Sequence, residues 1–208
     1  MTAAPPVPDG HGVETPGRLR RALVFALNFF KHPRMVGTFA VSSPALVQRL
    51  LAPVDWQHCR TVVELGPGVG TITRALLAAM PAQARLIVIE TNDDFVRELR
   101  QALPDPRLQV VAGSAADLDR HLQALGARPV DVVVSGIPFS TMPAQAREDT
   151  LDAVAHALGD RGQFLVYQYS AMIREPLQQR FNQVHSEREW RNLVPVHLFR
   201  VSQPVSTP

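Results

Sequence analysis

Acidic residues are absent from one long stretch of this chain, although the chain as a whole is nearly balanced in charge. The 208 residues carry 21 Lys and Arg against 19 Asp and Glu, a net charge of +2. That excess is too small to identify a partner. No Asp or Glu occurs between Thr15 and Val54, so the positive charge is local. Lysine is nearly absent too, because Lys31 is the only one.

Cysteine is equally scarce, and the histidines do not form a metal pattern. The single Cys59 excludes an intrachain disulfide, and none of the seven histidines has a metal-ligand spacing with cysteines or acids. We therefore expect no metal. Residues 1–16 are rich in Pro, Gly and small polar residues and lack the apolar core of a signal peptide. They predict a disordered tail and a cytoplasmic protein.

Residues 17–34 predict an amphipathic helix. The uncharged run from Ala22 to Phe30 is far below the roughly twenty residues that span a bilayer. Such a helix can lie on an anionic membrane surface, with apolar side chains in the headgroup boundary and basic ones against the lipid charges. A helix packed as a lid over a ligand site would show the same stripe, but the lack of acids favours the membrane. The expected membrane contacts are Arg18, Arg20, Arg21, Leu23, Leu27, Phe30 and Lys31.

The segment 61–70, Thr-Val-Val-Glu-Leu-Gly-Pro-Gly-Val-Gly, predicts a buried strand, a tight turn and the start of a helix. Its glycines allow positive φ and a close approach to a ligand. The last two glycines are two residues apart, whereas the dinucleotide fingerprint has three. Pro67 removes a backbone N–H and Glu64 would repel a pyrophosphate, so a ligand with an ammonium group is favoured. An ordinary strand-to-helix turn is the alternative.

A second acid follows the next strand. Residues 71–80 predict a helix that ends at Pro81, and Arg85–Glu90 is an apolar strand, which completes a βαβ unit. A carboxylate at the end of the second strand is placed to accept ribose hydroxyls. Glu90 fits this role, and a solvated strand-end acid is the alternative.

Two more strands are followed by polar loops. Residues 108–112 lead into a turn that contains Ser114, and residues 130–134 lead into the loop 135–143. Because the carboxyl ends of central strands border the ligand crevice of a doubly wound sheet, we expect the second loop to face the reacting group.

The glycine segment resembles motif I of the class I S-adenosylmethionine-dependent methyltransferases. The resemblance implies a Rossmann-like α/β fold, with a mostly parallel seven-stranded sheet, flanking helices and an antiparallel last hairpin from about residue 181 to 201. It implies S-adenosylmethionine as the cofactor and residues 35–208 as the methyltransferase domain. The cofactor-binding residues that it implies are Glu64, Gly66, Pro67, Gly68, Gly70, Glu90, Thr91, Ser114, Ala115 and Ser135.

The loop Ser135-Gly136-Ile137-Pro138 is similar to that of the bacterial phospholipid N-methyltransferases, which usually reads Ser-Gly-Leu-Pro. The resemblance also takes in the basic helix, residues 37–44, the strand 164–169 and the tail 190–196. It implies methyl transfer to the amine of phosphatidylethanolamine, towards phosphatidylcholine, by a cytoplasmic protein held peripherally at the inner membrane. The partners are then an anionic membrane surface and an aminophospholipid.

The chemistry requires a neutral amine, whose ordinary pKa is about 10. Alignment and proton acceptance are the expected contributions, with Ser135, the Ile137 carbonyl and the Tyr169 phenol as the catalytic candidates. Strand alternation predicts Tyr167 and Tyr169 on one face and Gln168 on the other. A quaternary product would need aromatic faces. The expected substrate contacts are Phe39, Pro138, Phe139 and Tyr169.

Three other functions stay open. The acceptor can be another aminolipid, such as an ornithine lipid, because the sequence does not separate the headgroups. A relative of the rRNA adenine dimethylases is a second alternative, against which stands Gly136 in place of their amine-accepting Asn. The third is a non-catalytic membrane or partner-binding module, which the intact Glu64, glycine loop and Glu90 disfavour. Nucleic acid is therefore not the expected partner.

Overall fold

The computed structural model describes residues 42–192 and 195–205, all of which belong to one compact unit that spans residues 38–208. The predicted tail 1–16, the predicted amphipathic helix 17–34 and Phe39 lie outside the described residues. Within the described part of the chain, no helix is long and apolar enough to cross a membrane.

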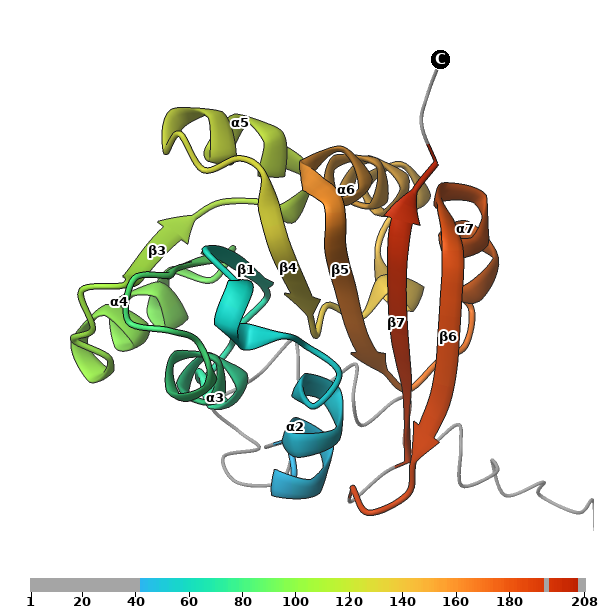
Figure 1. Cartoon of the computed structure of the whole chain (residues 1–208), viewed down its shortest axis with the longest axis horizontal. Helices are drawn as coiled ribbons and strands as arrows, with labels where there is room; N and C mark the ends of the chain where they lie inside the picture. The colour runs from blue at the N-terminus through green and yellow to red at the C-terminus, as the bar shows by residue number, and fades with distance from the viewer. Residues whose placement is uncertain (1–41, 193–194, 206–208) are drawn as a thin grey trace, which may run out of the picture. The chain divides into compact units, whose positions relative to one another are not determined.

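A seven-stranded sheet in the order β3-β2-β1-β4-β5-β7-β6 forms the centre of this unit (Figure 1). β1 to β5 are parallel, and β7 runs antiparallel to both β5 and β6. The prediction of a mostly parallel Rossmann-like sheet with a final antiparallel hairpin is confirmed. The strands are β1 Thr61–Leu65, β2 Arg85–Glu90, β3 Leu108–Ala112, β4 Val130–Ser135, β5 Leu158–Gln168, β6 Phe181–Glu189 and β7 Val196–Pro204.

Helices connect the parallel strands and cover both faces of the sheet. The α-helices are α2 Pro44–Leu51, α3 Thr71–Ala79, α4 Asp93–Ala102, α5 Leu118–Ala124, α6 Ala144–Ala157 and α7 Arg174–Arg180, with short 3-10 turns at Trp56–His58, Ala115–Asp117 and Phe139–Thr141. α2 begins at a proline, and the Ser43 side chain caps it by accepting a hydrogen bond from the Leu46 N–H. α3 ends at Ala79, just before Pro81, which cannot continue a helix.

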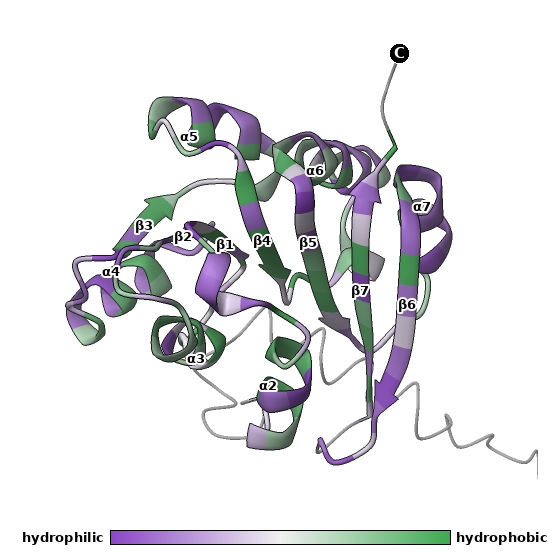
Figure 2. Ribbon diagram, viewed as in Figure 1, coloured by the Kyte–Doolittle hydropathy of each residue, from purple (hydrophilic) through white to green (hydrophobic). Residues whose placement is uncertain are grey.

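The central strands form because both of their faces are buried. β1 is buried along its whole length, and the Val-rich β4 is buried at all but one position. Such apolar, β-branched runs are typical of parallel strands covered by helices on both sides. Figure 2 shows the contrast: hydrophobic residues dominate the central strands, whereas β6 is largely hydrophilic.

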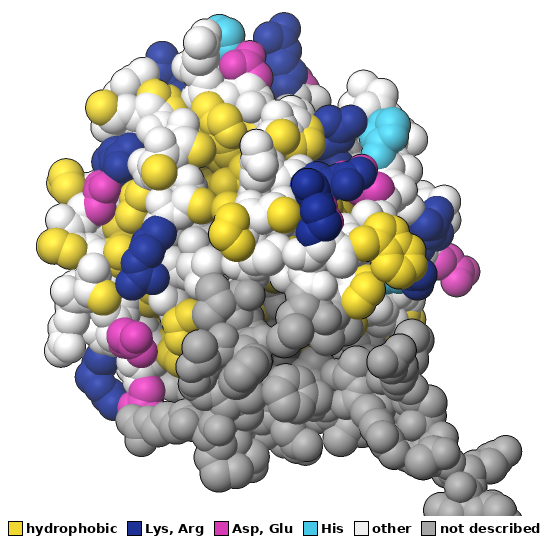
Figure 3. Space-filling view, turned by 90° about the horizontal axis from the view of Figure 1, so that it is seen from below, with side chains coloured by type: hydrophobic (Ala, Val, Ile, Leu, Met, Phe, Trp, Pro, Cys, Tyr) yellow, Lys and Arg dark blue, Asp and Glu magenta, His cyan; other side chains and the backbone are white. Residues whose placement is uncertain are grey.

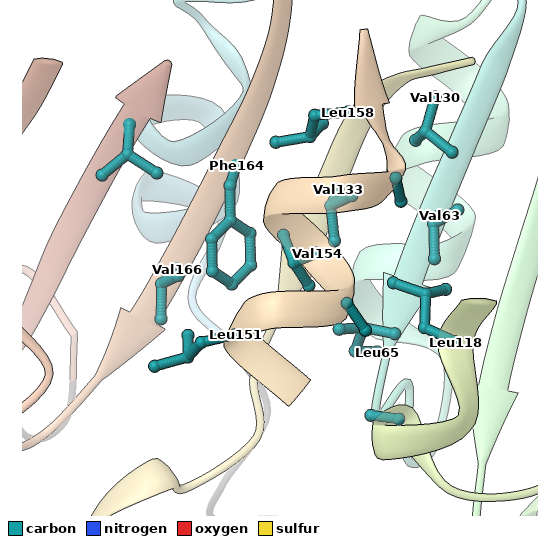
Figure 4. Packing of buried hydrophobic residues seen from close by; sticks show 14 of the residues in the cluster. Val63, Leu65, Leu118, Val130, Val133, Leu151, Val154, Leu158, Phe164 and Val166 are labelled. Atoms are coloured by element: carbon teal, nitrogen blue, oxygen red, sulfur yellow. The ribbon is translucent and has the colours of Figure 1, made fainter. Parts of the chain in front are cut away.

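Two hydrophobic clusters fill the space between the sheet and the helices. One contains Leu151 and Val154 of α6 packed against Val133 of β4 and Phe164 of β5 (Figure 4). The other joins α2 and α3 to the opposite face of the same strands, with Leu46 and Leu76 nearly fully buried. The two clusters together bury both faces of the central strands.

The ends of β1, β2, β4 and β5 form one border of the sheet, which we call the carboxyl edge. The strand registers place Leu65 beside Ser135, and Ser135 beside Val166. The loops after these strands are therefore neighbours, although up to a hundred residues separate them in the sequence. The predicted site residues that the structure describes lie in or next to these loops and the turn after β3.

Candidate active site

Each glycine of the loop after β1 adopts positive φ, but their surroundings differ. φ is +71° at Gly66, +54° at Gly68 and +79° at Gly70. A Cβ on Gly66 would lie 3.0 Å from Ile137 Cγ1, and one on Gly70 would lie 2.7 Å from Leu99 Cδ2. A Cβ on Gly68 would meet no atom within 4 Å. The outer glycines therefore fit the loop against the protein, whereas Gly68 faces open space that a ligand can fill.

Glu64 is a buried acid directly before this loop. Its side chain is 2% exposed and accepts a hydrogen bond from Thr73 Oγ1 at 2.7 Å. Burial raises the pKa of Glu64 to about 8; the Thr73 hydrogen bond opposes the rise and the negative charge of Glu90 adds to it. A neighbouring cation would favour the ionised carboxylate. Glu64 thus fits a ligand that carries an ammonium group.

Glu90 is not a solvated strand-end acid, because only 8% of it is exposed. One carboxylate oxygen accepts a hydrogen bond from the Gly68 N–H at 3.2 Å and the other from the Asn92 N–H at 2.8 Å. The Thr91 hydroxyl also donates to it at 3.4 Å. Glu90 therefore ties the loop after β2 to the glycine loop. Each carboxylate oxygen can accept more than one hydrogen bond, so ribose hydroxyls can still be accommodated.

The turn after β3 contributes backbone groups more than side chains. The Ser114 hydroxyl accepts a hydrogen bond from the Ala116 N–H at 3.2 Å, and Ala115 is buried. Asp117, the other polar residue of the turn, pairs with Arg120 at 3.4 Å and is half exposed. The Ser114 side chain therefore shapes the turn.

The loop after β4 packs onto the glycine loop. The Ser135 hydroxyl is fully buried and accepts a hydrogen bond from the Ile137 N–H at 3.2 Å, while the Ile137 carbonyl accepts one from the Phe139 N–H at 2.9 Å. Pro138 is partly buried. Phe139 is fully buried in the hydrophobic core, so the structure does not place it on the substrate side as the sequence predicted. The backbone of Phe139 belongs to the loop after β4, but its side chain packs in the hydrophobic core beneath this loop.

Tyr167 is the residue that the sequence analysis did not select. A Cβ on Gly136 would lie 2.2 Å from the Tyr167 hydroxyl and 2.5 Å from Cζ, so only glycine fits at position 136. The pKa of the Tyr167 phenol is raised by burial and by the charge of Glu64, while a hydrogen bond with Ser42 lowers it in part. The phenol is therefore neutral and lies close to Glu64. The missing side chain at Gly136 was the signal that could have revealed it.

Tyr169 follows β5 and packs, with Tyr167, against the sheet face that α2 and α3 cover. Val166 packs in the cluster on the other face, and Gln168 follows it by two residues along the strand. This confirms the predicted alternation. Burial raises the pKa of the Tyr169 phenol above its ordinary value of 10. The side chain is thus protonated at neutral pH and can serve as a neutral hydrogen-bonding group, but not as a phenolate base.

The sheet order, the positive-φ glycine loop and the two buried acids define a nucleotide-type site of the methyltransferase kind. A family model described as "Methyltransferase domain" matches residues 62–162. An ornithine lipid N-methyltransferase from Singulisphaera acidiphila is 33% identical over 174 residues, which cover 83% of this chain and 91% of that protein. The chain belongs to the class I S-adenosylmethionine-dependent methyltransferases, and it is an N-methyltransferase that uses this cofactor.

Other relatives match over a shorter length. The ribosomal RNA small subunit methyltransferase A of Thiobacillus denitrificans is 38% identical, but over 74 residues, or 36% of this chain and 28% of that protein. Among solved structures, a Burkholderia thailandensis 1,6-didemethyltoxoflavin-N1-methyltransferase with bound S-adenosylhomocysteine has a TM-score of 0.63 at 16% identity, with 93% of each chain covered. A Thermotoga maritima O-methyltransferase has a TM-score of 0.64 at 12% identity, covering 86% of this chain and 73% of that one. These structures share the fold.

Proposed function

We propose that the enzyme transfers methyl groups to the amine of an aminolipid at a membrane surface, and that an ornithine lipid is the first candidate acceptor. The observation that supports this most is the ornithine lipid N-methyltransferase, whose similarity extends over 91% of its length. That relative favours the aminolipid alternative of the sequence analysis over phosphatidylethanolamine, which was its first choice.

Phosphatidylethanolamine is the second candidate. It is supported by the Ser135-Gly136-Ile137-Pro138 loop, which is similar to that of the bacterial phospholipid N-methyltransferases. Both headgroups present a primary amine next to a lipid body. The reacting group is therefore the same, and the difference between the two lies in the charges around the amine.

The carboxyl edge fits the cofactor. Gly68 provides open space for a close approach, Glu64 provides a buried acid for an ammonium group, and Glu90 provides acceptors for ribose hydroxyls. Thr91, Ser114 and Ala115 border the same region. When bound, S-adenosylmethionine supplies an electrophilic methyl group on a sulfonium. The chain's own residues then need to hold the acceptor amine in line with that methyl.

The amine must lose its proton before it can attack, because its pKa is about 10 in water. Burial at this edge disfavours the charged form of the amine and so lowers the pKa of its ammonium group. The neutral phenols of Tyr167 and Tyr169 and the Ile137 carbonyl are acceptors at the neighbouring ends of β4 and β5. We assign them the orientation of the amine, and solvent takes up the proton. The buried Ser135 hydroxyl accepts a hydrogen bond from the Ile137 N–H and so stabilises the conformation of this loop.

Membrane contact is part of the proposal. The residues 17–34, with their basic ends and apolar stripe, are the expected anchor on an anionic surface at the cytoplasmic side of the inner membrane. This would bring the enzyme to its acceptor without a spanning helix.

A methyl-transfer assay with three acceptors tests the proposal. The protein is incubated with methyl-labelled S-adenosylmethionine and, separately, with ornithine lipid vesicles, phosphatidylethanolamine vesicles and ribosomal RNA. We expect label in lipid, fastest with ornithine lipid. Label in RNA alone, with binding that weakens steeply as salt rises, would favour rRNA dimethylation instead.

A further inference from the structure

The turn between β6 and β7 carries the most exposed large hydrophobic residue of the described chain. Trp190 directly follows β6 and is 64% exposed. Because β6 and β7 are antiparallel and Gln168 pairs with His197, this turn lies at the carboxyl edge, beside the end of β5. The turn therefore projects from the same border of the sheet as the candidate active site.

Exposed hydrophobic side chains are concentrated at this border. Among residues 42–192 and 195–205, four large hydrophobic residues are exposed: Val69, Met172, Trp190 and Val205. Val69 belongs to the glycine loop, Met172 follows β5 and Trp190 follows β6, so three of the four lie at the carboxyl edge. Val205 follows β7 at the opposite end.

Arginines surround Trp190. The Arg188 guanidinium lies over its ring, 5.3 Å from the centroid, and the Arg191 side chain next to it is 68% exposed. The pKa of His197, which pairs with Arg188 across the hairpin, is lowered by burial and by the charges of Arg188 and Arg174. Glu187 and Glu189 pair with Arg49 and Arg191, so the arginines on this side of the hairpin, which also include Arg174 and Arg188, outnumber the acids. Figure 3, which looks at this border, shows basic side chains beside hydrophobic ones.

The described residues next to Trp190 are held by hydrogen bonds and an ion pair. Glu189, 1% exposed, accepts a hydrogen bond from the Arg191 N–H at 2.7 Å, and it also pairs with Arg49 of α2 at 3.6 Å. The Asn192 side chain accepts a hydrogen bond from the Ser43 N–H at 3.1 Å. The described residues on either side of Trp190 are thus anchored to the body of the domain, while its ring is exposed.

We infer that Trp190, Arg188 and Arg191 form a lipid contact that seats the carboxyl edge on an anionic bilayer. This inference rests on the aminolipid function proposed above, because a lipid amine has to reach that edge. Tryptophan is enriched at the boundary between headgroups and hydrocarbon, where its ring is buried and its N–H stays hydrated. The arginines meet the anionic lipid charges. The contact lies outside the predicted N-terminal anchor and orients the catalytic border towards the membrane.

Tryptophan fluorescence tests this directly in the full-length protein, because the chain has only two tryptophans. Trp190 is the sole fluorophore in a Trp56→Phe variant, and Trp56 is the sole fluorophore in a Trp190→Phe variant. Trp56 precedes β1 and so lies at the opposite border of the sheet. With phosphatidylglycerol vesicles that contain brominated lipid, we expect a blue shift and quenching of Trp190 and an unchanged Trp56. An unchanged Trp190 in vesicle-bound protein would overturn the inference.

Vesicle co-sedimentation provides the second measurement. We expect Trp190→Ala to weaken binding roughly tenfold and Arg188→Ala about fivefold. Arg60→Ala, an exposed arginine before β1, should leave binding unchanged. Equal effects of Arg60→Ala and Arg188→Ala would contradict a localised contact. A Trp190-dependent dimer in the absence of lipid would assign the surface to a second copy of the chain instead.

The two proposals fail in different ways. Methylation of ornithine lipid dispersed in detergent does not require the lipid contact, so Trp190→Ala should retain it. If the wild-type protein methylates no aminolipid while Trp190 is quenched by vesicles, the acceptor assignment fails and the membrane surface stands. If lipid is methylated and Trp190 is never quenched, the inference about Trp190 fails alone.

Discussion

The β1–β2 half and the β4–β5 half of the carboxyl edge differ in whether backbone groups or side chains form their surface. On the β1–β2 side, backbone groups and two buried acids form the site, and Gly66, Gly68 and Gly70 give the loop its shape. On the β4–β5 side, side chains fill the space, with Tyr167 lying where a Cβ of Gly136 would be. The β1–β2 half suits the cofactor, which is the same molecule whichever acceptor is methylated. The second half can change with the acceptor, because a single side chain there alters the space.

Substitution of Gly136 should have the largest effect on the β4–β5 half of the edge. We expect Gly136→Ala to lower turnover on ornithine lipid about 100-fold, because its Cβ would displace the Tyr167 ring and the loop with it. The change should cost about 1–3 kcal/mol in the free energy of unfolding, measured by urea denaturation. Cofactor affinity, measured by calorimetry with S-adenosylhomocysteine, should change little. A loss confined to cofactor affinity would place Tyr167 on the other half of the edge.

A matched pair of glycines tests the cofactor half. Gly68 and Gly126 share a φ of +54°, and a Cβ on either would meet no protein atom within 4 Å. Alanine at either position should cost about 1 kcal/mol of stability, because both adopt the left-handed conformation. We expect only Gly68→Ala to weaken S-adenosylhomocysteine binding, by about tenfold or more. Equal affinities in the two variants would mean that the open space at Gly68 is not used by the cofactor.

The acid before the glycine loop predicts a dependence on pH. The pKa of Glu64 is raised from 4.5 to about 8, so the folded protein keeps a proton there that the unfolded chain releases. The stability that this contributes is complete below about pH 4.5 and is lost as the pH rises to about 8. Glu64→Gln cannot release this proton, so its stability should not fall with pH for this reason. The free energy of unfolding of the variant minus that of the wild type should therefore increase between about pH 5 and 8, by on the order of a few kcal/mol.

The same variant should lose cofactor affinity, most clearly above about pH 8, where Glu64 in the wild-type protein is ionised without a ligand. Glu98→Gln, on the exposed side of α4, is the control. Parallel stability curves for Glu64→Gln and wild type across this range would show that the acid titrates normally.

The smallest effect is expected at Tyr169. Its neutral phenol is one of several acceptors, so Tyr169→Phe should lower turnover only a few-fold at unchanged stability. Rates measured separately on unmethylated and partly methylated lipid would locate the step concerned. Unchanged rates on every lipid would remove the hydroxyl from the chemistry.

The cofactor half could be predicted from the sequence because backbone conformation leaves a direct mark on it. Positive φ requires glycine at Gly66 and Gly70, and a strand-end acid can be recognised from its spacing, as at Glu90. The strands β1 to β4 were also readable, since their apolar runs are short and bounded by turns.

The acceptor half was less predictable because its contacts join residues far apart in the sequence. Phe139 lies in a loop but is buried in the core, which the sequence around it does not indicate. Tyr167 and Gly136 meet across neighbouring strands; the missing side chain at Gly136 signals a close neighbour there but does not say which residue it is. β5 also begins at Leu158, earlier than the predicted strand, because Leu158 pairs with Val130.

The identity of the acceptor is tested most directly by competition. Vesicles that contain equal amounts of ornithine lipid and phosphatidylethanolamine, with ribosomal RNA added, are incubated with labelled S-adenosylmethionine, and the products are separated by mass spectrometry. We predict methyl groups on the ornithine lipid amine first, on phosphatidylethanolamine more slowly, and none on RNA. Methylated adenine in the RNA with unmodified lipid would contradict the proposed function.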